Sequence, residues 1–442
     1  MTLHPGDAPL QASSHLSPAE AIENFLRRLP DSCRLLVAFS GGGDSTGLLA
    51  ALADARRSHP GLSLHAVTID HGLRPGSAEE AVAAARVSRK LGVPHTTLRW
   101  EGAKPATGIQ AAARAVRYRL LATEAGRLGA DLVVTGHTFD DQLETVAMRR
   151  LRNPSGEAGM DEAVLIERSA WVVRPFLAVR RQSIRTYLEK RRLSWSEDPS
   201  NENPAFERVR IRQAGIDEAF PLKAPDHASS QVAAQFVRDH VRAYSAAVIA
   251  LDLSDFHVHY RPHWVVLMTL ISIAGGREHG PGFDVGNRVV ESIADGGDFC
   301  RTAGRVVIDR RKSMLYLCRE ARGLGAITIS SGEKTIWDGR FEIANAGPAP
   351  VTIAAGTMAK TAQPLLPAPA DSRLPGGLVR RAAASAPHLI DGDMAGILVR
   401  PVLAPFEHFL PHHRFALADS LNVAFGREHF LPLPLRISPF DT

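Results

Sequence analysis

The sequence lacks the features that would place it among secreted, membrane or cluster-binding proteins. It has three cysteines in 442 residues and no C-x-x-C pair, which excludes a disulfide framework and the usual spacing of zinc or iron–sulfur ligands. Its longest uncharged apolar stretch, residues 264–274, is shorter than the roughly 18 residues that a membrane-spanning helix needs. The first sixteen residues have neither a basic start nor an apolar segment, so no signal peptide is expected. These absences predict a cytoplasmic protein.

Composition and charge are otherwise those of an ordinary globular protein. Apolar residues make up 45% of the chain and charged residues 22%, and the length predicts about two or three domains. The formal charge of +5 and the pI near 9.3 are compatible with a polyanionic partner. Most basic residues are arginines that cluster along the chain, which suits either phosphate recognition or a solvated face.

Residues 34 to about 200 alternate between short apolar runs and longer segments with helical spacing. The runs that predict strands are 34–39, 62–70, 94–100 and 131–136. The segments that predict helices are 46–57, 77–92, 109–129 and 140–152. Because strand and helix alternate at this pitch, we expect right-handed crossovers and an α/β fold with a doubly wound parallel sheet. Ligands of such sheets bind at the carboxyl ends of the strands.

The chain changes character after about residue 212. Residues 227–275 hold long stretches rich in Ala, Val and Leu that favour helices. Residues 305–320 alternate like a pair of strands, and the Pro-, Ala- and Gly-rich stretch 344–377 indicates loop or linker. Near the end, residues 403–426 can form a short helix. The sequence has no internal repeat.

A glycine-rich segment between the first predicted strand and helix is the strongest chemical signal. We call it the glycine loop; its residues are Ser40, Gly41, Gly42, Gly43, Asp44 and Ser45. It matches neither the Walker A pattern nor G-x-G-x-x-G. Glycines allow close backbone approach, and successive N–H groups at a helix start cradle an anion. A carboxylate in such a cradle suits a phosphate bridged by Mg²⁺. The alternative is a tight turn in which Asp44 or Ser45 only caps the helix.

A second group of polar residues follows the fourth predicted strand. His137 lies at the strand end, and Asp140, Asp141 and Glu144 begin the next helix. Glu144 comes one turn after Asp141 on the same helix face. An acidic residue followed three positions later by Glu is also a helix-start signature, since both charges favour the helix dipole. The pattern alone supports capping as well as catalysis, and the glycine loop upstream favours catalysis.

The S-G-G-x-D-S loop resembles that of the PP-loop ATP pyrophosphatases, and further motifs narrow the match. They are Asp70-His71-Gly72-Leu73-Arg74, Thr135-Gly136-His137, Asp140-Asp141-Gln142-x-Glu144-Thr145, Arg174-Pro175-Phe176-Leu177, Trp195-x-x-Asp198-Pro199-Ser200-Asn201, and Arg208, Arg210 and Arg212. In this order they resemble the tRNA(Ile)-lysidine synthetases, densely over residues 33–215. The match is weaker beyond, at Arg400-Pro401 and Phe409-Leu410-Pro411. One departure is Thr138, where the family often has a second His.

The resemblance implies an architecture and a reaction. Residues 18–217 would be a PP-loop (adenine nucleotide hydrolase-like) ATP-binding catalytic domain. Residues 218–325 would be a mainly helical domain that positions tRNA, and residues 326–442 a small α+β region that binds tRNA. ATP would adenylate O2 of the cytidine at the first anticodon position of a CAU-bearing isoleucine tRNA. Free L-lysine would then attack C2 through its ε-amine and expel AMP, which forms lysidine.

Within that reaction the resemblance gives each candidate residue a role. The glycine loop would bind ATP and hold the departing pyrophosphate, and Asp44 and Asp141 would share one Mg²⁺. At pH 7 only about one lysine ε-amine in 2,500 is neutral, a deficit of roughly 4.6 kcal/mol. Glu144 could accept the amine proton or hold the ammonium group. His137 could donate to a phosphate or to the cytidine carbonyl.

Two arginine pairs are candidates for contact with tRNA phosphate or ATP. Arg114 and Arg117 share a face of the long helix over 109–129, and Arg208 and Arg212 lie four residues apart. The alternative for both pairs is a solvated helix face.

Three other functions remain open on the sequence. A tRNA thiolase would need catalytic or cluster-binding cysteines near the motifs. An ammonia-using amide ligase would not need the large arginine-bearing second half. A non-catalytic tRNA-binding protein would bind tRNA regardless of ATP, and the intact glycine loop argues against it.

Overall fold

The computed structural model describes residues 16–152, 159–197, 207–215, 224–357, 362–368 and 374–436. Contacts group the chain into two compact units. The first unit is Met1–Asp226 with Leu431–Thr442, and the second unit is His227–Phe430. The first expected boundary, at 217, lies close to the unit boundary, while a separation near residue 325 remains a prediction. Among the described helices, none is both long and apolar enough to cross a membrane.

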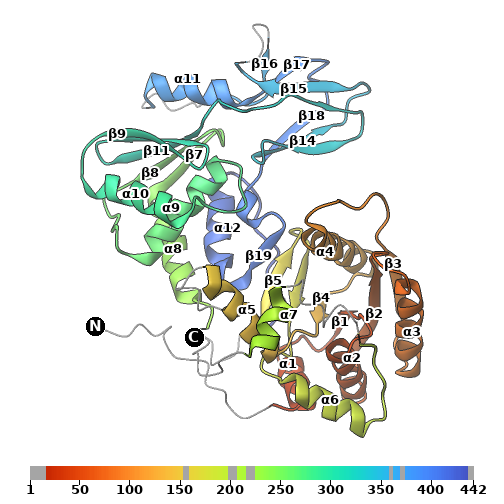
Figure 1. Ribbon diagram of the computed structural model, residues 1–442. Helices are drawn as coiled ribbons and strands as arrows, with labels where there is room; N and C mark the ends of the chain where they lie inside the picture. The colour runs from red at the N-terminus through yellow and green to blue at the C-terminus, as the bar shows by residue number, and fades with distance from the viewer. Residues whose placement is uncertain are drawn as a thin grey trace. The chain divides into compact units, whose positions relative to one another are not determined.

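The first unit is built on a sheet whose central strands are parallel (Figure 1). Its strands are β1 (Cys33–Ala38), β2 (Leu62–Asp70), β3 (His95–Arg99), β4 (Leu132–Thr135), β5 (Ala163–Ile166) and β6 (Ala170–Val173). Within this unit their order is β5-β6-β4-β1-β2-β3. Only β5 runs antiparallel, as a hairpin with β6. The expected doubly wound sheet is confirmed, and the fully buried apolar strands β4, β5 and β6 are typical of a sheet covered on both faces.

Four helices follow strands of this sheet as the sequence predicts: α2 (Gly43–Ala55), α3 (Ser77–Lys90), α4 (Ile109–Leu128) and α5 (Phe139–Arg152). The unit also contains α1 (Pro18–Leu26), α6 (Arg181–Lys190) and α7 (Glu207–Ala214), which were not predicted. The four predicted strands and four predicted helices all lie within about three residues of their expected bounds. Gly129 ends α4 in the left-handed region at φ +61°, which a glycine adopts without strain.

The strand order places two loops side by side at one edge of the sheet. β1 lies between β2 and β4, so the chain builds outward through β3 and then returns to the other side of β1. The ends of β1 and β4 therefore meet where the winding reverses, the usual ligand crevice of such sheets. Contact there is close: a Cβ added to Gly136 would lie 2.9 Å from the Asp44 carbonyl oxygen. Any larger residue at 136 would push the start of α2 away.

The end of the described chain returns to the first unit. The Trp171 indole Nε1 donates to the Leu431 carbonyl at 2.9 Å. The Arg436 amide donates to the Arg28 carbonyl at 2.7 Å, and its guanidinium pairs with Asp31 at 3.1 Å. Residues 431–436 are therefore part of this unit although 227–430 separate them from it in sequence.

The second unit begins with more strand than expected. Its helices α8 (His227–His240), α9 (Arg261–Ala274) and α10 (Phe283–Ala294) accompany an antiparallel sheet of order β7-β8-β11-β10-β9. The strands are β7 (Val241–Tyr244), β8 (Val248–Asp252), β9 (Phe299–Ala303), β10 (Val306–Arg311) and β11 (Met314–Arg319). The predicted strand pair over 305–320 is confirmed as β10 and β11. The helical stretch predicted over 227–275 is interrupted by the hairpin β7-β8, whose strands are too short for a clear period-2 signal.

The rest of the second unit contains two small sheets, two helices and the short strand β19 (Phe409–Pro411). One sheet has the order β12-β15-β17-β16 and the other β13-β14-β18. Their strands are β12 (Ile327–Ile329), β13 (Lys334–Trp337), β14 (Phe341–Asn345), β15 (Val351–Ala355), β16 (Gln363–Pro364), β17 (Pro387–Asp391) and β18 (Ile397–Pro401). The helices are α11 (Gly376–Ser385) and α12 (Phe415–Ala424). The helix predicted within 403–426 is confirmed as α12. The loop or linker expected over 344–377 contains β15 and β16 instead, so that expectation was wrong there.

A buried charge cluster joins the two halves of the second unit. Asp338, in the turn between β13 and β14, accepts from Arg319 Nε at 3.0 Å and Arg340 Nε at 2.7 Å, and also pairs with Arg305. Arg319 ends β11 of the five-stranded sheet, and Arg305 lies in the turn between its strands β9 and β10. The Asp338 and Arg340 side chains are each 4% exposed and that of Arg319 is 1% exposed, so the carboxylate compensates cations that water does not reach.

Candidate active site

The glycine loop leads into α2 without a side-chain cap on the first amide groups of the helix. α2 begins at Gly43, and no side chain caps its first turn. The Ser45 hydroxyl instead closes the loop: it donates to the Gly42 carbonyl at 3.0 Å and accepts from the Ser40 amide at 3.2 Å. Gly41 has φ +81°, a conformation that suits glycine. The capping alternative for Asp44 and Ser45 is therefore wrong, and the amide groups of the first turn can meet an anion.

A second segment packs against this loop. The Ser196 amide donates to the Gly41 carbonyl at 2.9 Å. A Cβ added to Gly43 would lie 3.4 Å from Trp195 Cδ1, so the indole lies at van der Waals distance from this position. Trp195 is thus placed beside the glycine loop. The neighbouring motif residues Asp198, Pro199, Ser200 and Asn201 lie outside the described residues.

Asp141 combines the two roles that its sequence pattern allows. The Thr138 amide donates to Asp141 Oδ2 at 2.8 Å, and the Asp141 amide donates to Thr138 Oγ1 at 3.3 Å. This reciprocal pair is a capping box at the start of α5. The other oxygen, Oδ1, faces the Arg181 guanidinium at 3.1 Å. Thr138, the departure from the family pattern, is the N-cap residue.

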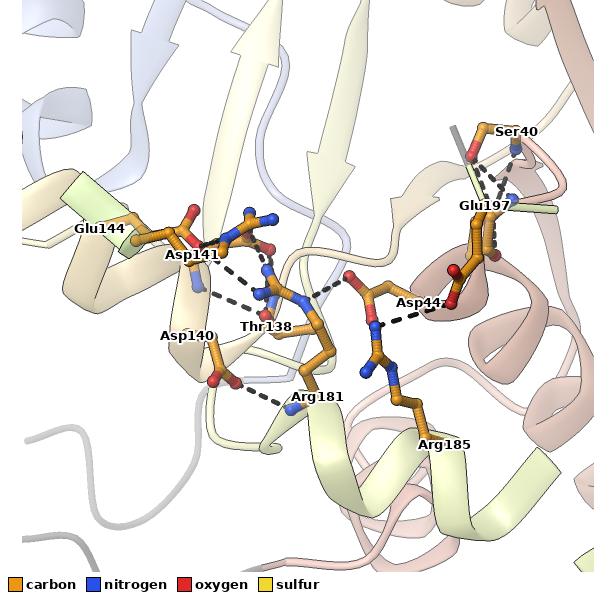
Figure 2. A network of polar contacts seen from close by, with 12 residues as sticks. Ser40, Asp44, Thr138, Asp140, Asp141, Glu144, Arg181, Arg185 and Glu197 are labelled. Carbon is orange, nitrogen blue, oxygen red and sulfur yellow. Dashed lines mark hydrogen bonds and ion pairs between the residues drawn. The ribbon is translucent and has the colours of Figure 1, made fainter. Parts of the chain in front are cut away.

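Arg181 lies at the centre of the carboxylates (Figure 2). Its Nε is 3.2 Å from Asp44 Oδ2, its Nη2 is 3.1 Å from Asp141 Oδ1, and its Nη1 is 3.5 Å from Glu144 Oε1. Its backbone amide donates to Asp140 Oδ2 at 2.8 Å, which fixes the start of α6 against α5. A single guanidinium therefore joins the glycine loop to the acidic start of α5.

Glu144 is surrounded by three guanidinium groups. Its side chain is 1% exposed, and besides Arg181 it contacts Arg208 Nε and Arg212 Nε, each at 2.8 Å. Arg208 and Arg212 come from α7, so these pairs hold α7 on α5. The solvated-face alternative for Arg208 and Arg212 does not hold, because both guanidinium groups turn toward the site.

The other two candidate arginines lie on α4. Arg117 Nη2 is 3.4 Å from His71 Nε2, just beyond the end of β2. The Arg114 guanidinium lies over the Tyr118 ring at 4.9 Å from its centroid. Both side chains are exposed, which leaves contact with a phosphate and a solvated face equally compatible with their placement.

His137 lies at the end of β4, where the sequence places it. Its Nδ1 is 2.9 Å from the Thr135 hydroxyl. If Thr135 donates this bond, Nε2 carries the ring proton and can donate to a ligand. Desolvation lowers the pKa of His137 to about 3, and the charge of buried Arg174 adds to that shift. Burial therefore favours the neutral ring, which can donate one hydrogen bond.

Comparison with known proteins shows the family of this chain. Residues 16–219 match the PP-loop domain family. The chain is 42% identical to a tRNA(Ile)-lysidine synthase of Rhizobium meliloti (strain 1021), over 94% of this chain and 96% of that protein. The chain belongs to the tRNA(Ile)-lysidine synthase family. A second member, from Mesorhizobium japonicum (strain LMG 29417 / CECT 9101 / MAFF 303099), is 37% identical over 90% of this chain and 93% of its own length.

A solved structure also matches part of the chain. It is the U34-tRNA thiolase NcsA from Methanococcus maripaludis with its [4Fe-4S] cluster, at 15% identity and a TM-score of 0.39. The match covers 45% of this chain and 70% of that one.

In this member of the lysidine synthase family the two central carboxylates differ in pKa. Burial raises the pKa of Asp44 to about 6, because desolvation outweighs the attraction of Arg181. Burial also acts to raise the pKa of Asp141, but Arg208 and Arg181 hold it below its usual value. Burial acts to lower the pKa of Arg181, and the surrounding carboxylates raise it overall. Asp141 is thus the firmly ionised member of the pair.

The sequence did not single out Arg181 as a site residue. In the sequence it is one of several clustered arginines. It reaches the site because α6 begins at the sheet edge after the motif Arg174-Pro175-Phe176-Leu177. The available signal was its position directly after that motif.

In lysidine synthases, as PP-loop proteins, the nucleotide is ATP. Asp44 and Asp141 suit Mg²⁺, which proteins hold through one or two carboxylates together with substrate phosphates.

Proposed function

We propose that this chain ligates L-lysine to C2 of the cytidine at the first anticodon position of an isoleucine tRNA with a CAU anticodon. The chain is an ATP-dependent ligase of the lysidine synthase family. One observation carries the finer assignment: Arg181 brings Asp44 of the glycine loop and Asp141 of α5 together at the switch point of the sheet.

In the first step the cytidine O2 attacks the α-phosphorus of ATP and pyrophosphate leaves. The open first turn of α2 and the amides of the glycine loop bind the departing pyrophosphate. Asp44 and Asp141 would hold Mg²⁺, which neutralises negative charge on the phosphates. His137, neutral and at the end of β4, can donate through Nε2 to a phosphate oxygen or to the cytidine carbonyl.

In the second step the lysine ε-amine attacks C2, the C2–O2 bond breaks, and AMP leaves with that oxygen. The amine must lose a proton, and Glu144 is the carboxylate that we propose to accept it or to hold the ammonium group. Its guanidinium partners oppose protonation, so the amine must replace at least one of them. Arg208 and Arg212 on α7 are the partners closest to its oxygens.

Contact with tRNA is proposed for the exposed arginines of α4 and for the second unit. Arg114 and Arg117 lie near the ends of β2 and β4, where an anticodon loop must enter to reach ATP. Phosphate contacts of this kind would make tRNA affinity fall with salt concentration. The tRNA-positioning and tRNA-binding roles of residues 218–325 and 326–442 remain part of this proposal.

The test is a pyrophosphate-release assay with ATP and Mg²⁺, to which isoleucine tRNA, lysine or both are added. Labelled lysine should enter the CAU tRNA and not a variant tRNA that lacks the cytidine. Turnover that needs ammonia and no tRNA would favour an amide ligase, and sulfur transfer would favour a thiolase. Absence of ATP turnover in every combination would leave a tRNA-binding protein.

A further inference from the structure

Two carboxylates from different elements share one edge of a guanidinium group. Asp44 Oδ2 contacts Nε of Arg181 and Asp141 Oδ1 contacts Nη2, two nitrogens bonded to the same carbon. A single carboxylate usually occupies such an edge. The two oxygens therefore converge on one small cationic group, as they must to bind a single metal ion.

Three carboxylates and three guanidinium groups contact one another around this point. The carboxylates of Asp44, Asp141 and Glu144 are faced by the guanidinium groups of Arg181, Arg208 and Arg212. Figure 2 shows the Arg181 guanidinium between Asp44 and Asp141. A divalent cation added between Asp44 and Asp141 would meet the positive charge of Arg181 at close range. Metal and guanidinium cannot both occupy that position.

The anchoring of Arg181 lets its side chain leave while its main chain stays. The Arg181 amide is held by Asp140 Oδ2 at 2.8 Å, independently of the guanidinium. The side chains of Arg181 and Asp44 are 19% and 28% exposed, so water reaches this pair, whereas Glu144 at 1% is sealed. Water thus reaches the Arg181–Asp44 contact, although the side chains of Arg208 and Arg212 are more exposed, at 39% and 38%.

We propose that Arg181 is a positioning residue that occupies, in the ligand-free protein, the place between Asp44 and Asp141 where Mg²⁺ binds. This inference rests on the proposed metal role of the two carboxylates. The guanidinium keeps the two anions together before ATP arrives and gives way when the metal enters with the nucleotide. It thereby weakens binding of metal alone.

The exchange of the Arg181 guanidinium for the metal is tested with Mn²⁺ as the metal probe and the full-length protein, without ATP, tRNA or lysine. Electron paramagnetic resonance of free Mn²⁺ gives the Kd. We expect R181Q to bind Mn²⁺ about tenfold more tightly than the wild-type chain, because the guanidinium between the two carboxylates is gone. Arg208, whose Nη2 lies 3.7 Å from Asp141 Oδ1, remains in both proteins. The control is R185Q, one turn further along α6, whose ion pair is with Glu197 at 3.9 Å and which should match the wild type.

A double variant locates the metal and decides the outcome. R181Q combined with D44N should lose the gain in Mn²⁺ affinity. Equal Kd values for R181Q and wild type, or weaker binding by R181Q, would overturn the exchange. Should R181Q fail to fold, R181M replaces it. Its side chain also carries no charge, so tighter Mn²⁺ binding is still expected and an unchanged Kd would also overturn the proposal.

This readout is independent of the reaction. If R181Q does not bind Mn²⁺ more tightly while the wild type shows normal tRNA-dependent pyrophosphate release, the exchange is rejected and the proposed function is left intact. Loss of lysine incorporation in the wild type would reject the proposed function instead.

Discussion

The two oxygens of Asp141 face different partners, and this division explains how one residue serves both structure and chemistry. Oδ2 is committed to the Thr138 amide at the start of α5, while Oδ1 points toward Arg181. The capping interaction fixes the direction of the carboxyl group. The oxygen that is left over is therefore aimed at the ligand crevice without further support.

Amide variants separate these roles. We expect Asp44→Asn and Asp141→Asn each to lower pyrophosphate release by ~100-fold or more, because the charge that stabilises the reacting phosphates is lost. Asp141→Asn keeps an oxygen for the Thr138 amide, so its fold should persist. Filter binding should give a tRNA Kd within about tenfold of the wild type, or ~1.4 kcal/mol. A larger loss of binding would mean that these residues are structural.

His71 makes the stability of the first unit depend on pH. Burial lowers the pKa of His71 to about 4, and the positive charge of Arg117 contributes. The unfolded chain therefore binds more protons than the folded chain between pH 6.5 and 4, and stability is lost as pH falls through that window. We expect the loss to be about 1–2 kcal/mol, allowing for the partial exposure of the ring.

The variant His71→Gln should remove that loss, since the amide does not titrate. Urea unfolding at pH 4, 5.5 and 7 measures it, with the exposed His279→Gln as the control. A wild-type and a His71→Gln chain that lose the same free energy between pH 7 and pH 4 would contradict this assignment.

At the scale of elements, α5 depends on the residue that precedes it. Thr138→Ala removes the hydroxyl that accepts from the Asp141 amide, and we expect a loss of about 1 kcal/mol in the free energy of unfolding. Thr138→Ser retains the cap and should lose far less. Because the cap also orients Asp141, pyrophosphate release should fall in Thr138→Ala and recover in Thr138→Ser. Equal activity in the two variants would separate the cap from the site.

The elements around the nucleotide were predictable from local patterns. Buried strands β1 and β4 are short apolar runs that end at polar motifs, and parallel topology brings their ends together. The β5-β6 hairpin was not predicted, because its turn uses Glu167 and Arg168 at positive φ instead of the Asn-Gly or Asp-Gly that usually marks such a turn. Arg181 was missed as a site residue for a different reason: its contacts are made across 37 to 137 positions of sequence, which no local pattern encodes.

At the scale of the whole molecule, the second unit depends on one buried carboxylate. Asp338→Asn would leave Arg319 and Arg340 without a compensating charge, and we expect a loss of about 3 kcal/mol in stability. Asn also tolerates the left-handed backbone at φ +52°, so the change isolates charge from turn geometry. Thermal unfolding of the full chain measures it, with exposed Asp295→Asn as the control. A midpoint unchanged by Asp338→Asn would contradict the assignment.

Residues 431–436 have a consequence for biogenesis. A ribosome that translates this chain releases the whole of His227–Phe430 before it releases the segment that bonds Trp171 and Arg28. During synthesis the segment that contacts Trp171 and Arg28 therefore reaches the nucleotide-binding sheet only after the second unit has emerged. The enzyme acquires its finished ATP-binding unit last, although almost all of that unit is encoded first.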